Sequence, residues 1–264
     1  MHVMGILNVT PDSFSDGGCW SLPATALEHA RQMIAQGATI IDVGAESTRP
    51  GGSERITAEA EWARLEPVLT PLQAHVEQAE DVTLSVDTIH ASTARRALAL
   101  GVGIINDISG GCYDPDMVPV VAQSDARFVV QHWRGFPGDP NLDLQYPQGV
   151  GQVLAETLGQ VAGALGRGLR PEQVIIDPGL GFALSNSYSW RVVENLGTWT
   201  EGEYPVLVGA SRKRFIRERY GDNVEEGTRI VTQMVAAAGA WAVRVHDVAA
   251  NIDAINAANN EGIR

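Results

Sequence analysis

The sequence predicts an α/β protein that folds as a single (β/α)8 TIM barrel, and three observations support this fold class. Short β-branched runs alternate with longer helical segments along the whole chain. Eight such strand–helix units share the chain, with about 33 residues each. Three helical segments end at a glycine (Gly37, Gly101 and Gly239), and a polar residue follows five positions later. Strict alternation indicates a parallel sheet, and eight units favour a closed barrel over an open sheet.

Each strand is predicted where β-branched residues form a short run, and each helix where apolar residues recur at helical spacing. In chain order, the strands are expected near Val3–Asn8, Thr39–Val43, Thr83–Asp87, Gly103–Asp107, Phe128–His132, Val174–Asp177, Val206–Gly209 and Ala242–Val245. The helical segments are expected over Ala24–Gln36, Thr57–His75, Ala91–Leu100, Gly151–Leu165, Thr228–Ala238 and Val248–Ala258. No linker interrupts the pattern, so residues 1–264 are expected to form one domain.

The charge and the cysteines restrict the class of protein. A formal net charge of −13 repels nucleic acid and anionic membrane surfaces. The two cysteines, Cys19 and Cys112, have no metal-binding spacing and indicate a reducing compartment. The chain begins without a signal pattern, and its longest apolar run, Met234–Val243, is too short to span a bilayer. We therefore expect a cytoplasmic protein.

Polar groups end all eight predicted strands. They are Asn8, Asp42, Asp87, Asn106 with Asp107, His132, Asp177, Lys213 just past Gly209, and Arg244 with His246. Turns favour Asp and Asn, which explains any single position. The whole set is not explained in this way, because Asp87, Asp177 and Arg244 directly follow β-branched runs. In a parallel barrel these ends share one face, where barrel enzymes build their active sites.

The chemistry of these groups divides into two halves. Asp87, Asn106 and Asp177 are rich in acceptors and suit a flat heterocycle with several N–H donors. The cationic half suits a phosphate or diphosphate and consists of Arg49, Lys213, Arg244 and His246. The loop of residues 44–52 is rich in glycine, and it either closes over such a ligand or forms a solvated turn.

Other catalytic chemistries have little support. His29, His75 and His90 fall in or beside predicted helices, and no Cys/His cluster predicts zinc. The chain has no G-x-S-x-G elbow and no phosphate-binding P-loop motif. A magnesium ion held by oxygen atoms and a diphosphate would leave only an Asn or Asp as its signature.

Seven segments, in order along the chain, resemble dihydropteroate synthase, an enzyme family of the folate pathway. They are MGILNVTPDSFSDGG (4–18), IIDVGAESTRPG (40–51), SVDT (85–88), NDISGG (106–111), IIDPGLGF (175–182), VLVGASRKRF (206–215) and RVHDV (244–248). HWR (132–134) and SRKRF (211–215) are also similar to actinobacterial members. The resemblance implies a (β/α)8 barrel, a homodimer, and a transferase that uses Mg2+. The implied reaction joins p-aminobenzoate to 6-hydroxymethyl-7,8-dihydropterin diphosphate and releases diphosphate and 7,8-dihydropteroate, and sulfonamides are expected to inhibit it.

The resemblance also implies a role for individual residues. The implied pterin-binding residues are Asp87, Asn106, Gln131, Asp177 and Lys213. Arg244 is implied to stack on the pterin and, with His246, to reach the diphosphate, and Asn8 takes the magnesium position. The implied border of the p-aminobenzoate site is Thr48, Arg49, Pro50, Phe182 and Lys213.

The first loop of the family pattern contains Asp12, Phe14 and Asp16. Phe14 is implied to cover the aromatic amine. Asp12 and Asp16 either offset a cationic intermediate or cap the loop as Asx turns. With Arg49, Lys213, Arg244 and His246, these two carboxylates form the expected catalytic set.

The sequence departs from the family pattern at Gln131, Leu184, Ser189 and Arg214, where Met, Lys, Asn and Ser are usual. Two alternatives to the synthase therefore stay open. One is a diverged pterin-binding paralogue. The other is a methyltetrahydrofolate-type pterin-binding barrel, which should lack the cationic half that this chain retains.

Overall fold

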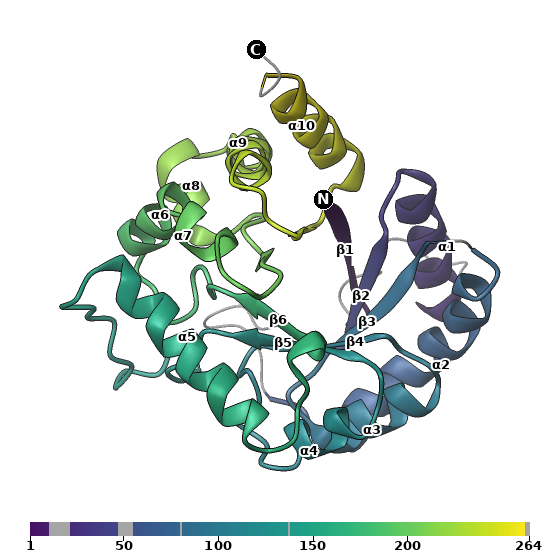
Figure 1. The fold of residues 1–264 in the computed structure, drawn as a ribbon. Coiled ribbons are helices and arrows are strands. Elements are labelled where there is room, and N and C mark those ends of the chain that lie inside the picture. Colours follow the sequence, from purple (N-terminus) through teal and green to yellow (C-terminus); the bar gives the residue numbers. More distant parts are fainter. Residues whose placement is uncertain (11–21, 47–54, 80, 137, 262–264) are drawn as a thin grey trace.

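The computed structural model is a barrel of eight parallel strands surrounded by helices (Figure 1), and it describes residues 1–10, 22–46, 55–79, 81–136 and 138–261. The strands are β1 (His2–Asn8), β2 (Ile40–Gly44), β3 (Thr83–Asp87), β4 (Ile104–Asp107), β5 (Arg127–Gln131), β6 (Val174–Asp177), β7 (Leu207–Val208) and β8 (Ala242–Val245). Their order in the sheet is β6-β5-β4-β3-β2-β1-β8-β7. A parallel bridge between Ile176 and Val206 joins β6 to β7 and brings the two edges together. The predicted fold class is confirmed.

Helices connect successive strands, as parallel pairing requires. They are α1 (Leu22–Ala35), α2 (Ala58–Val76), α3 (Ala91–Ala99), α4 (Met117–Ala122), α5 (Val150–Leu165), α6 (Asn186–Glu194), α7 (Gly197–Thr200), α8 (Arg214–Tyr220), α9 (Val224–Ala237) and α10 (Val248–Glu261), with a 3-10 turn η1 at Pro171–Gln173. Among the described residues, no helix is both long and apolar enough to cross a membrane.

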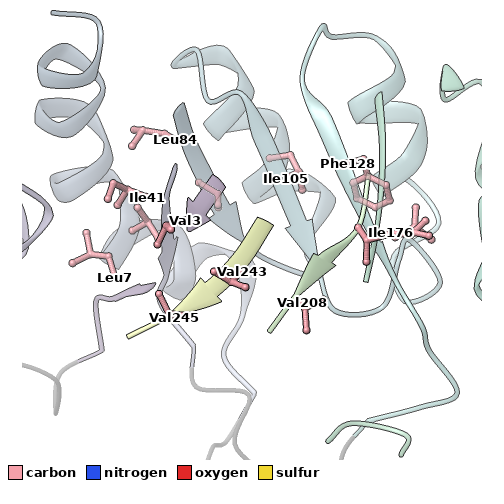
Figure 2. Close-up of a cluster of buried hydrophobic side chains, with 14 of the residues drawn as sticks. Val3, Leu7, Ile41, Leu84, Ile105, Phe128, Ile176, Val208, Val243 and Val245 are labelled. Carbon is pink, nitrogen blue, oxygen red and sulfur yellow. The ribbon is translucent and has the colours of Figure 1, made fainter. Parts of the chain in front are cut away.

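The strands have two apolar faces that pack on different partners. Outward residues such as Val3, Ile41 and Ile105 belong to the main core cluster (Figure 2). The same cluster includes residues of the surrounding helices, such as Leu65 and Val231. Inward residues form a separate cluster inside the barrel, made of Met4, Ile40, Ile104, Val129, Ile175, Leu207 and Ala242. Side chains alternate along a strand, so the residue two positions after each inward residue also points into the barrel.

The structure differs from the sequence expectation mainly in its short elements. β7 has two residues, because the chain leaves the sheet at Gly209 and turns toward α8. The sequence expectation does not include the helices α4, α6, α7 and α8. Their four to nine residues give few turns for a periodic pattern, although α3, which also has nine residues, was predicted. Helix α9 begins at Val224, one turn before the predicted start.

Candidate active site

A ring of polar side chains lies directly above the inward apolar cluster. Ile40, Ile104 and Ile175 are inward residues, and two positions later come Asp42, Asn106 and Asp177. The same step leads from Val129 to Gln131 and from Ala242 to Arg244. These residues come from five different strands, yet alternation places all of them inside the carboxyl-terminal mouth of the barrel.

Asp42 is the central anchor of this ring. It is fully buried, and its Oδ2 accepts from Arg244 Nε at 2.6 Å and from Asn106 Nδ2 at 3.0 Å. Its Oδ1 accepts from Ser85 Oγ at 2.6 Å. A buried carboxylate needs such partners, because an unpaired charge away from water is costly. Asp42 therefore fixes the direction of both Arg244 and Asn106.

Arg244 also reaches Asp87, so one guanidinium joins two carboxylates. Nη2 donates to Asp87 Oδ2 at 2.7 Å. Burial lowers the Arg244 pKa, but the charges of Asp42 and Asp87 outweigh it and leave the pKa above its ordinary value. Burial raises the pKa of Asp87 to about 7 against the opposing charge of Arg244, and the charge of Asp42 adds to the rise. Asp87 thus titrates near neutral pH.

On the opposite side of the mouth, Asp177 and Lys213 face the loop that follows β6. Asp177 Oδ1 accepts from the Gly179 N–H at 2.7 Å, and burial raises its pKa although the charge of Lys213 opposes the shift. Lys213 Nζ donates to the Leu180 carbonyl at 2.6 Å and lies 4.6 Å from the centre of the Phe182 ring. Burial lowers the pKa of Lys213 to about 8, with Asp177 opposing the shift.

Gly209 leaves room where these two sides meet. A Cβ built on Gly209 would lie 3.7 Å from Lys213 Nζ, 3.8 Å from Arg244 Cβ and 3.9 Å from Asp177 Oδ2. Side chains from β6, from β8 and from the segment after β7 therefore lie around one position at the end of β7.

Gln131 lies beside Asp177 as its register partner in β6. The side chain is buried, and Nε2 donates to the Ile108 carbonyl at 3.0 Å. The loop that carries Ile108 is shaped by Asp107, which accepts from the Ser109 and Gly111 N–H groups. Burial raises the pKa of Asp107 to about 6, although these hydrogen bonds oppose the rise.

Two other predicted residues lie at the ends of β1 and β8. His246 Nδ1 is hydrogen-bonded to Ser211 Oγ at 2.9 Å, which ties the end of β8 to the segment after β7. Asn8 is the last residue of β1 and pairs in register with Gly44. Asn8 is half-buried and carries a neutral amide oxygen. Such a neutral oxygen donor fits Mg2+, which prefers oxygen ligands.

A second group of possible metal ligands lies at the rim and consists of Glu46, Glu61 and His90, whose ligand atoms lie within 4.8 Å of one another. Hydrogen bonds already engage these groups. Glu61 accepts from Thr88 Oγ1 at 2.7 Å, and His90 Nε2 contacts the Ile56 carbonyl at 3.2 Å. Burial raises the pKa of both Glu46 and Glu61. These contacts hold the segment around Ile56.

The remaining predicted residues, Asp12, Phe14, Asp16, Thr48, Arg49 and Pro50, lie outside the described residues. The positions that depart from the family pattern have structural explanations. Leu184 is buried in the main core, and Ser189 Oγ accepts from the Gly181 N–H at 3.2 Å. Arg214 is exposed, and its Nε donates to Asn186 Oδ1 at 3.4 Å.

Comparisons with known proteins agree with this geometry. The family model for pterin binding enzymes matches residues 4–246. A dihydropteroate synthase of Mycobacterium leprae is 41% identical over 97% of this chain and 91% of that protein. The structure of dihydropteroate synthase from Anaplasma phagocytophilum with bound 6-hydroxymethylpterin-monophosphate has a TM-score of 0.89 and 38% identity, covering 98% of each chain. The Yersinia pestis dihydropteroate synthase in complex with a sulfonamide drug has a TM-score of 0.88 and 32% identity, covering 100% of this chain and 94% of that one.

Proposed function

The chain belongs to the dihydropteroate synthase family of pterin-binding enzymes, and from this membership we propose how its residues carry out the reaction. The reaction joins p-aminobenzoate to 6-hydroxymethyl-7,8-dihydropterin diphosphate and yields 7,8-dihydropteroate and diphosphate. One observation carries the assignment of roles: Asp177, Lys213 and Arg244 come from different segments and lie around Gly209. Arg244 is in turn bonded to Asp42 and Asp87. The whole chain, residues 1–264, is proposed to be the single pterin-binding domain.

The pterin is bound by the buried acceptors. Asp177, Asn106 and Asp87 present carboxylate and amide oxygens inside the barrel, where no bulk water competes for the N–H donors of the ring. Gln131 borders the same space beside Asp177, and Lys213 can donate to an acceptor of the ring. A ring with alternating donors and acceptors would satisfy both kinds of group.

The diphosphate end is assigned to Arg244, His246 and Arg49, with Asn8 holding Mg2+. A bound Mg2+ ion would neutralise charge on the diphosphate oxygens. Arg244 is cationic throughout the working pH range, because Asp42 and Asp87 keep its pKa high. A preorganised cation of this kind stabilises the charge that develops on the leaving group, and one such donor is typically worth about 3–4 kcal/mol.

The second substrate enters between the pterin and the rim. When the C–O bond to diphosphate breaks, the electron pair leaves with the diphosphate and the pterin ring delocalises the cation on the exocyclic CH2. The arylamine is neutral at pH 7, so it attacks this carbon without a strong general base and then loses a proton. Phe182 and Lys213 border the p-aminobenzoate site in this proposal, with Phe14, Thr48 and Pro50 completing it. Asp12 and Asp16 either offset the cation or shape their loop.

A direct assay tests this function. Purified protein is mixed with both substrates and Mg2+, and diphosphate and dihydropteroate are measured together. We expect diphosphate and dihydropteroate to form in equal amounts. We also expect turnover to fall when a sulfonamide is added as a competitor of p-aminobenzoate. Pterin binding without product would instead support a pterin-binding paralogue, and methyl transfer from methyltetrahydrofolate would support the other alternative.

The resemblance to the family also supports a homodimer, and the acidic composition with two cysteines supports a cytoplasmic location. Light scattering on the purified chain tests the oligomeric state. A mass of about 28 kDa in place of twice that value would contradict the dimer.

A further inference from the structure

The ammonium group of Lys213 depends on the β6–α6 loop, residues 178–185, for its position. The Leu180 carbonyl accepts from Nζ at 2.6 Å, and the Phe182 ring lies 4.6 Å from it. A Cβ on Gly181 would lie 3.4 Å from Lys213 Cδ, so the stem of the lysine also rests against this loop. A small movement of the loop would change both the hydrogen bond and the burial of Lys213.

Tyr146 holds this loop from outside the barrel mouth. Its hydroxyl donates to the Ala183 carbonyl at 2.8 Å, next to Phe182 in the chain. The residue is buried, and burial raises the pKa of the phenol, so the hydroxyl keeps its proton. Tyr188 stands against the same ring at 5.0 Å between centroids, and its hydroxyl donates to the Tyr146 carbonyl at 2.8 Å.

Arg134 and Glu156 fix Tyr146 in turn. The guanidinium of Arg134 lies 3.9 Å from the centre of the Tyr146 ring, and Nη1 donates to the Gln145 carbonyl at 2.8 Å. Arg134 also makes two hydrogen bonds to Glu156 of helix α5, at 2.8 and 2.6 Å. Because of these bonds the pKa of Glu156 falls to about 2, although burial opposes the shift. The carboxylate therefore stays ionised at every pH at which the enzyme would work.

We propose that Tyr146 is a positioning residue for the active site: through its hydrogen bond to Ala183 it holds the β6–α6 loop against Lys213. Arg134 and Glu156 keep the tyrosine in place. The proposal rests on the proposed function of Lys213 in binding the substrates. In this proposal the effect of Tyr146 passes through the loop to the lysine, because its hydroxyl is bonded to Ala183.

Replacing the hydroxyl alone tests the proposal. Tyr146→Phe keeps the ring under Arg134 and leaves the Ala183 carbonyl without its donor. We expect kcat/KM for p-aminobenzoate to fall by about tenfold, because the variant loses one buried hydrogen bond to the loop that contacts Lys213. A loosened loop would admit water to Lys213, and its pKa would then rise because burial is what lowers it. The alkaline limb of the pH–rate profile should therefore move to higher pH.

Thr200→Val is the matched control, because it removes a hydroxyl that donates to a carbonyl, that of Ala238 before β8, and leaves every contact of Tyr146 in place. Both variants should lose similar thermal stability, and only Tyr146→Phe should shift the pH profile. Glu156→Gln, which weakens the hold on Arg134, should shift it in the same direction. Equal kinetic effects in Tyr146→Phe and Thr200→Val, or a changed Tm with an unchanged profile in Tyr146→Phe, would overturn the proposal.

A readout without turnover separates this proposal from the proposed function. The folded protein is acylated with acetic anhydride at a series of pH values and then digested, and mass spectrometry measures the acylation of Lys213. The pH dependence of this acylation reports the titration of the lysine in the absence of substrates. The midpoint should rise in Tyr146→Phe and not in Thr200→Val. An inactive parent protein would contradict the function, whereas an unchanged midpoint would contradict the role of Tyr146.

Discussion

The two sides of the barrel mouth are held by different kinds of contact. On the arginine side, which consists of Asp42, Asp87, Asn106 and Arg244, side chains of four strands bond directly to one another. On the lysine side, which consists of Asp177, Lys213 and the β6–α6 loop, the partners are backbone groups, namely the Gly179 N–H and the Leu180 carbonyl. The arginine side is therefore as rigid as the sheet, and the lysine side depends on a loop and on what supports it.

Removing the central anchor of the arginine side should have the largest effect. Asp42→Ala leaves the buried groups of Arg244, Asn106 and Ser85 without their shared acceptor. We expect a loss of about 3–5 kcal/mol in the free energy of unfolding, measured by urea denaturation, because one partner of a buried charge pair is removed.

Asp42→Asn retains one acceptor oxygen and should lose less, and Asp222→Ala, an exposed aspartate, should lose almost nothing. A loss below about 1 kcal/mol for Asp42→Ala would show that the arginine side is not anchored by this residue.

The corresponding change on the lysine side should spare the fold and remove binding. Asp177→Ala deletes an acceptor whose one side-chain hydrogen bond within the described part of the chain comes from the Gly179 N–H. We expect pterin affinity to fall by roughly 100-fold or more, because a hydrogen bond to a buried charged acceptor is lost. Titration calorimetry with a pterin ligand measures the change, and a circular dichroism melt checks the fold. Unchanged affinity would refute the acceptor role of Asp177.

The sequence predicts the arginine side better than the lysine side, because side chains hold the first and backbone groups hold the second. The groups of the arginine side are side chains at the ends of β-branched runs, so residue type and position at the strand end predict them, Asp42 included. For the lysine side, Asp177 and Lys213 were identified, but Leu180, Tyr146 and Glu156 were not. A carbonyl that accepts a hydrogen bond has no sequence signature, and Tyr146 lies in a loop without periodicity.

The fold follows a similar rule. Eight strands with long helices between them give a periodic signal over many residues, and the barrel was predicted from it. The two-residue strand β7 and the four-residue helix α7 are set by packing against their neighbours, and so few residues show no period.

The pH dependence of stability should separate the two sides further. Burial raises the pKa of Asp87 from 3.8 to about 7, so the folded state keeps a proton that the unfolded chain releases between these values. Stability should therefore fall as the pH rises through this window, by at most about 1.4 kcal/mol per pH unit, and level off above pH 7.

Asp87→Asn should remove this contribution, so the difference in unfolding free energy between the two proteins should change steadily from pH 4 to pH 7. Denaturation curves at four pH values measure it. A difference that is constant with pH would show that Asp87 stays ionised beside Arg244.

The smallest effect is expected where the two sides meet. Gly209→Ala places a methyl group at ordinary contact distance from Lys213, Arg244 and Asp177, so the fold can accept it. The methyl group occupies space among Asp177, Lys213 and Arg244 that the proposed pterin would use. We therefore expect the pterin KM to rise by about tenfold with little change in Tm. Gly163→Ala in helix α5 is the matched control, since a Cβ there meets nothing within 4 Å. It should leave KM unchanged and add about 0.5–1 kcal/mol of stability. If the Gly209 variant bound the pterin as well as the parent protein does, the substrate would have to be held on one side of the mouth alone, and the convergence around Gly209 would no longer support the assignment of the site.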